Sequence, residues 1–155
     1  MRFNFSLMHY DKKTEIQMMV LEYDDFVVLG KGTLSDSEEE WADAYSTMPM
    51  HVCKRLMKGD KPVFGVFVAP NVEPNLAQQL FKATWYANGE FKELNIIPFS
   101  TDQITRILQA FRKNKFSVKK LKSILNRFAE LKAEFKNGKE WYKKISEILP
   151  IFLMI

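Results

Sequence analysis

The sequence predicts an α/β fold, a mixed sheet flanked by helices and followed by a helical C-terminal segment. Residues 62–70, PVFGVFVAP, form an apolar run without polar alternation. Such a run is typical of a strand that is buried on both faces of a parallel or mixed sheet. Strand-like and helix-like segments alternate through the middle of the chain, which favours helices packed against that sheet. Apolar residues at helical spacing then dominate the last third.

The chain begins with segments of strand character. Phe3, Phe5 and Leu7 alternate with polar residues, the pattern of a half-buried strand. Residues 15–23 and 26–31 are two β-rich runs separated by two aspartates, which indicates a hairpin. We expect these three strands to form an antiparallel meander.

The helices are predicted from their caps and their apolar spacing. Ser35 or Asp36 should cap a helix over about 37–57, and Pro49 should kink or interrupt it. Residues 73–87 have the apolar spacing of a second helix.

The last third continues this pattern. A strand is expected over 94–99, followed by a helix that Ser100 or Thr101 caps and a further helix that Ser117 caps. Residues 139–149 should form a last helix or turn.

Length and composition restrict the class of protein. A chain of 155 residues, 46% hydrophobic and 27% charged, fits one folded domain. We expect an α/β core over 1–110 and a basic helical segment over 111–155 packed on the same domain. The single cysteine, Cys53, excludes a disulfide framework and a cysteine-based zinc site. No apolar run reaches the roughly 18 residues of a membrane span, so no membrane partner is expected, and a reducing cytoplasm is the expected location.

Charge is distributed unevenly along the chain. Residues 1–100 carry 10 basic and 14 acidic side chains, whereas residues 101–155 carry 13 basic and 5 acidic ones. A basic C-terminal third could bind phosphates or an acidic partner, but the solvated faces of lysine-rich helices are the more common source of such a charge.

Four short segments resemble one branch of type IIS restriction endonucleases, which belong to the PD-(D/E)xK nuclease superfamily. Residues 33–40, TLSDSEEE, are similar to the T/S-L-x-x-G-x-x-Q segment of that branch, and residues 48–52, MPMHV, to its V-x-R-H segment. Residues 60–70, DKPVFGVFVAP, resemble its KPVYGLFIAP strand, and residues 96–103, IIPFSTDQ, its VIPLT-x-x-Q step. The resemblance covers residues 15–110 and implies a restriction-endonuclease-like fold.

The catalytic carboxylates of that family do not carry over with these segments. Such enzymes hold Mg²⁺ between two carboxylates on adjacent strands. Alignment on the Thr33-Leu34 match places Met18 at the first acid and Lys31 at the second. The resemblance therefore implies a degenerate site, with a positive charge at the position of the metal.

Some family-like side chains remain, and the acids could have moved. Glu38 and Glu40 are the candidates for relocated acids, and His51 stands at the family's histidine. If the protein is active, the resemblance implies Mg²⁺ as its cofactor; otherwise no cofactor is implied. No set of metal ligands is assigned. Candidate DNA contacts, besides His51, are basic residues on two expected helices: Lys54, Arg55, Lys115, Lys119, Lys120 and Lys122.

Three functions stay open at this point. The leading one is a DNA-associated but catalytically degenerate relative of type IIS cleavage subunits. The second is an active Mg²⁺-dependent endonuclease with relocated carboxylates. The third is an accessory subunit or antagonist that binds protein and not DNA. Residues 148–155 are apolar, which indicates a packed strand or part of an interface with a partner subunit or a second copy.

Overall fold

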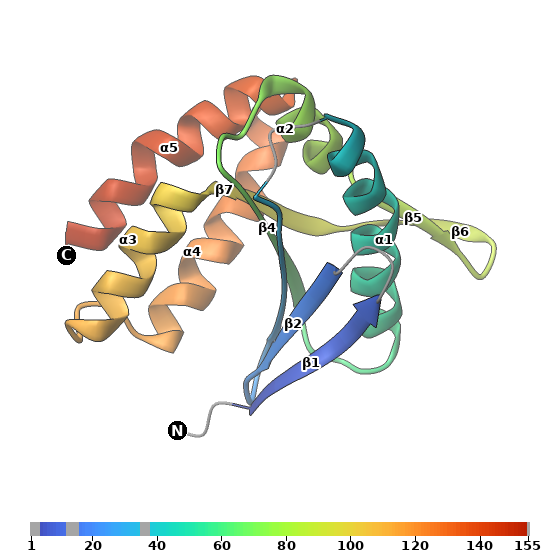
Figure 1. Cartoon of the computed structure of the whole chain (residues 1–155), viewed down its shortest axis with the longest axis horizontal. Helices are drawn as coiled ribbons and strands as arrows, with labels where there is room; N and C mark the ends of the chain where they lie inside the picture. Colours follow the sequence, from blue (N-terminus) through green and yellow to red (C-terminus); the bar gives the residue numbers. More distant parts are fainter. Residues whose placement is uncertain (1–3, 12–15, 35–37, 155) are drawn as a thin grey trace.

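A five-stranded mixed sheet forms the centre of the molecule (Figure 1). The computed structural model describes residues 4–11, 16–34 and 38–154. The strands of the sheet lie in the order β1-β2-β3-β4-β7. Their bounds are β1 Asn4–Asp11, β2 Ile16–Glu22, β3 Val27–Gly32, β4 Val63–Ala69 and β7 Asn95–Ser100. The first three strands are antiparallel, while β3, β4 and β7 are mutually parallel. The predicted meander and mixed sheet are confirmed; Phe3 lies outside the described residues.

Helices cover the sheet on both faces. The bounds of the helical elements are α1 Glu38–Met57, α2 Pro74–Phe81, α3 Thr101–Arg112, α4 Val118–Glu130, the 3₁₀ turn η1 Leu131–Glu134 and α5 Gly138–Met154. In Figure 1, α1 lies on the right of the sheet, and α3, α4 and α5 lie on the left. This arrangement confirms the predicted α/β class, a mixed sheet flanked by helices.

The central strand β4 shows why both faces must be covered. Gly65 faces α1, since a Cβ atom there would lie 3.0 Å from Cε of Met48. Phe64 points the other way and is 2% exposed. A strand whose residues are buried in both directions cannot face water, which accounts for its unbroken apolar sequence.

The edge strand β7 carries a proline. Pro98 has no N–H to donate, so it is tolerated on a strand that pairs on one side only. Ile96, Ile97 and Phe99 are buried, and Phe99 packs against Phe128 of α4 with ring centroids 6.1 Å apart. The C-terminal helices thus continue the same hydrophobic core.

The helix predicted over 73–87 is wrong in its second half. The helix ends at Phe81, and residues 84–93 form a separate two-stranded ribbon, β5 Thr84–Ala87 and β6 Glu90–Glu93. Asn88 and Gly89, both at positive φ, make the turn between its strands. The ribbon extends away from the body at the right of Figure 1.

The apolar C-terminal segment is helical and not a strand. It is the end of α5, which continues through Pro150, just as α1 continues through Pro49 without interruption. Leu149 is buried, and Phe152 packs edge-on against Phe128. Ile151 and Met154 on the same segment remain 60% and 84% exposed.

Helices α2 and α5 approach each other at a glycine. A Cβ atom on Gly138 would lie 2.5 Å from both the carbonyl carbon of Ala77 and Cα of Gln78. The backbone N–H of Gly138 donates to Oε1 of Gln78 over 2.6 Å. No side chain fits between these two backbones.

Replacing Gly138 with alanine is therefore expected to destabilise the fold by about 2 kcal/mol or more, because two helix backbones would have to separate. Urea denaturation followed by circular dichroism measures the loss. Gly59→Ala is the control, since its Cβ would meet nothing within 4 Å. Equal stabilities of the two variants would contradict the close packing of α2 on α5.

Candidate functional site

The two positions that match the family's metal ligands lie on neighbouring strands. Met18 is in β2 and Lys31 is in β3. Met19 pairs with Gly30 in the antiparallel ladder, so Met18 and Lys31 are the next residues along their two strands. The two positions that the sequence resemblance assigns to the family's acids are thus neighbours across β2 and β3.

Lys31 lies on the face of the sheet that α1 covers. It pairs in parallel register with Phe67, which lies two residues beyond Gly65 on β4. A Cβ atom on Gly65 would lie 3.0 Å from Cε of Met48 in α1. Residues two apart on a strand share a face. Lys31 is 5% exposed, so a lysine is buried at this position.

A magnesium ion does not fit these two positions. Mg²⁺ requires oxygen ligands, and neither a thioether nor an ammonium group supplies one. A buried ammonium would also repel the cation. Within the described ranges, no three His, Cys, Asp or Glu side chains gather closely enough to hold a metal ion.

The three catalytic candidates lie at two places on α1. Glu38 and Glu40 belong to its first turn, and their side chains lie outside the described part of the structure. Ser35 and Asp36, the expected caps, also lie outside it. His51 is half-buried and lies roughly 20 Å further along the helix axis than Glu38. All three residues remain catalytic candidates. Because His51 lies far along the helix from Glu38 and Glu40, the three do not belong to one site.

Glu22, at the end of β2, is held by two basic side chains. Its Oε1 accepts from Nη2 of Arg55 over 2.5 Å and from Nζ of Lys61 over 3.4 Å. Lys61 also donates to the backbone carbonyl of Tyr23 over 2.9 Å. These contacts connect the β2–β3 hairpin to the end of α1 and to the start of β4.

Lys122 of α4 contacts the same hairpin from the opposite side. Its Nζ donates to Oδ2 of Asp25 over 2.7 Å and lies 5.9 Å from the ring centroid of Phe26. The hydrogen bond from Lys122 and its positive charge hold the pKa of the Asp25 carboxyl below its usual range. Two of the predicted DNA contacts, Arg55 and Lys122, therefore each have a carboxylate partner within the protein.

The other predicted DNA contacts differ in their surroundings. Lys54, Lys115 and Lys119 are exposed. Lys120 is half-buried, with its Nζ 5.7 Å from the ring centroid of Phe116. Lys54 lies on α1, whereas the other three flank the start of α4, so the predicted residues fall on two surfaces.

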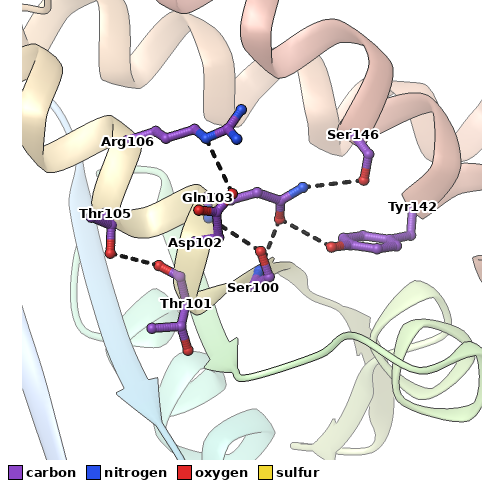
Figure 2. A network of polar contacts seen from close by, with 8 residues as sticks. All are labelled: Ser100, Thr101, Asp102, Gln103, Thr105, Arg106, Tyr142 and Ser146. Carbon is purple, nitrogen blue, oxygen red and sulfur yellow. Dashed lines mark hydrogen bonds and ion pairs between the residues drawn. The ribbon is translucent and has the colours of Figure 1, made fainter.

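The strand-to-helix step after β7 is fixed by one glutamine (Figure 2). Ser100 and Gln103 form a capping box: the Gln103 backbone N–H donates to Oγ of Ser100 over 3.1 Å. The Ser100 backbone N–H donates to Oε1 of Gln103 over 2.8 Å. The backbone N–H groups of Ser100 and Gln103, which have no acceptor within the helix, are thereby satisfied.

The same glutamine binds α5. Oε1 of Gln103 accepts from the Tyr142 hydroxyl over 3.1 Å, and its Nε2 donates to Oγ of Ser146 over 3.1 Å (Figure 2). The sequence motif that ends in Gln103 therefore has a structural role, because it joins the sheet, α3 and α5. Sequence analysis predicted the cap at Ser100 but not these two long-range partners.

A mixed sheet with helices on both faces, entered through an antiparallel hairpin, places the chain in the class of α/β proteins. The sequence profile described as AlwI restriction endonuclease matches residues 16–107 of this chain. The chain belongs to the AlwI restriction endonuclease family. The family resemblance found in the sequence is confirmed at this level.

A solved structure is similar over almost the whole chain. It is the crystal structure of the small subunit (R.BspD6I2) of the heterodimeric restriction endonuclease R.BspD6I. The likeness has a TM-score of 0.67 at 16% sequence identity and covers 93% of this chain and 79% of the subunit. At this identity it establishes the fold. None of the curated protein sequences matches the chain. No helix among the described residues is long and apolar enough to cross a membrane.

Replacing Gln103 with alanine is expected to lower the free energy of unfolding by about 1–3 kcal/mol, because the bond from the Ser100 backbone N–H to the Gln103 side chain and both contacts to α5 are lost. Chemical denaturation measures it. Gln109→Ala is the matched control on the exposed side of the same helix and should change stability by less than about 0.5 kcal/mol. Similar losses in both variants would contradict the role of Gln103.

The Asp25 carboxyl is expected to titrate below its ordinary value of 3.8, and Lys122→Gln should raise its pKa towards that value. A lowered pKa means that the ion pair stabilises the fold above the ordinary pKa and that this contribution disappears as the pH falls through the lowered one. NMR titration of the carboxyl carbon measures the shift. Lys119→Gln, on the same helix, should leave the Asp25 pKa unchanged.

Proposed function

We propose that this chain is a DNA-associated relative of the type IIS cleavage subunits, in the PD-(D/E)xK superfamily, that binds DNA without hydrolysing it. The observation that carries the proposal is the buried Lys31 on β3, at the position of the second metal-binding acid. Its neighbour on the adjacent strand, Met18, offers no oxygen ligand either.

The strand framework of the family's site supports the same proposal. Met18 and Lys31 occupy neighbouring strands, as a pair of metal ligands would. A lysine in place of the second acid brings a fixed positive charge to a site that otherwise recruits a divalent cation. Such a charge does not recruit a divalent cation, and an ammonium group does not activate a water molecule as a bound metal ion does.

A partner subunit forms part of the proposal. The structurally similar protein is the small subunit of a heterodimeric restriction endonuclease. A chain of the same architecture without its own metal ligands is suited to hold DNA or a companion chain in position, while hydrolysis is done elsewhere in the assembly. Two exposed aromatic rings on the β5–β6 ribbon, Tyr86 and Phe91, provide apolar surface for such contacts.

The experiment is a nicking and cleavage assay on supercoiled plasmid DNA with Mg²⁺ and, separately, Mn²⁺. We expect no metal-dependent product from the purified chain, because neither strand position supplies a ligand. A fluorescently labelled duplex in the same buffers reports binding. Binding without cleavage is the expected result.

Three variants test the alternative, an active Mg²⁺-dependent endonuclease with relocated carboxylates. If metal-dependent nicking occurs and Glu38→Gln or Glu40→Gln abolishes it, the relocated acids are active and the proposal is wrong. His51→Ala tests the third candidate in the same way. Metal-dependent activity that survives in all three variants and persists in a repeat preparation from a nuclease-deficient host would also contradict the proposal, whereas activity that disappears in that preparation came from a contaminating nuclease.

A further inference from the structure

The longest acid-free part of the C-terminal third runs from Gln103 to Ala129. It contains eight basic residues and no aspartate or glutamate. The structure divides these eight according to their contacts, and that division shows which of them are available for an external anion. The eight residues are Arg106, Arg112, Lys113, Lys115, Lys119, Lys120, Lys122 and Arg127.

Half of them have partners inside the protein. Arg106 pairs with Asp102 at 3.1 Å, Lys122 with Asp25 at 2.7 Å, and Arg127 with Glu134 at 3.3 Å. The Nζ atom of Lys120 lies above the Phe116 ring. These four residues contribute less positive potential to the outside than their number suggests.

The remaining four lie together in the chain and are exposed. They occupy the last residue of α3, the turn after it and the first turn of α4, and we name them the corner cluster: Arg112, Lys113, Lys115 and Lys119. None of the four has an ion-pair partner within the part of the chain that the structure describes.

The backbone under the corner cluster is fixed by its own contacts. Phe111 and Phe116, on either side of the turn, pack edge-to-face with ring centroids 4.8 Å apart, and Phe116 is 5% exposed. The backbone N–H of Lys115 donates to the carbonyl of Ala110 over 2.9 Å, and that of Asn114 to Phe111 over 3.1 Å. The four cations are therefore held on a defined corner, and binding does not have to order the loop first.

The first helix offers no comparable surface. Arg55 and Lys61 are occupied by Glu22, and the start of the helix carries Glu38, Glu39 and Glu40 in sequence. Carboxylates there would repel phosphates. The α3–α4 corner lies at the lower left of Figure 1, at the far side of the sheet from α1.

We propose that the corner cluster is the DNA-backbone contact of this protein, and that duplex DNA crosses the α3–α4 corner rather than α1. The inference rests on the proposed DNA association and names its surface. Arg112 and Lys113 join the predicted Lys115 and Lys119, while Arg55 and Lys122 serve the fold. The ligand is the phosphodiester backbone, contacted through charge and without readout of bases.

The test compares two quadruple variants of the full chain on one labelled duplex over a salt series. The first changes all four residues of the corner cluster to glutamine. The second is a matched control that changes four other exposed lysines to glutamine: Lys58, Lys136, Lys139 and Lys143. Each variant lowers the formal net charge from +4 to 0, so any difference between them depends on position.

The corner variant is expected to weaken binding about tenfold or more at low salt and to reduce the slope of log K against log[salt] by about 3.6, since each of the four lost phosphate contacts removes about 0.9. The control should keep a slope within about 1 of the native chain. Thermal unfolding of both variants confirms that they fold, as expected for changes at exposed positions.

The possible failures can be told apart. Equal losses in both variants, or a larger loss in the control, would overturn the corner assignment while DNA association itself stands. A native chain that binds no duplex even at low salt would overturn DNA association and the corner assignment with it. Cleavage by the native chain with an intact corner effect would overturn only the proposed lack of catalysis.

Discussion

Burial of β4 on both faces is the constraint on which the other features depend. The strand pairs in parallel with β3 and β7, and neither of its faces reaches solvent over most of its length. Gly65 lets α1 come close on one face, and Phe64 fills the core on the other. Because β3 takes its register from β4, Lys31 is placed beneath α1. The buried position of Lys31 thus follows from the packing of the central strand.

Ion pairs determine which basic side chains keep an uncompensated charge at the protein surface. The β2–β3 hairpin carries Glu22 and Asp25, and each binds a cation from a different helix, Arg55 of α1 or Lys122 of α4. These bridges are partly exposed, so each contributes little stability by itself. Their larger effect is electrostatic, because they offset the positive charges of Arg55 and Lys122, whereas the four residues of the corner cluster keep theirs. The uneven charge seen in the sequence is concentrated further by the fold.

Local signals were sufficient for most elements but not for their long-range partners. The two-sided apolar run of β4 and the cap at Ser100 could be predicted, since their causes lie within a few residues. The ribbon at 84–93 was missed because Leu76, Leu80 and Phe81 set a helical spacing that Trp85 continues by coincidence. Asn88-Gly89 between β-forming residues was the signal for a hairpin. The contacts of Gln103 with α5 span about forty residues, and no local pattern reveals them.

The buried Lys31 and the corner cluster lie on separate parts of this molecule. Lys31, which the sequence resemblance aligns with the family's second acid, is buried on the sheet beneath α1. The corner cluster lies at the end of α3, on the helices that cover the other face. A change of residue type at Met18 or Lys31 therefore leaves the charge of the corner unchanged. Under the proposed function, this separation is the physical reason why DNA association at the corner does not depend on metal ligands at the sheet.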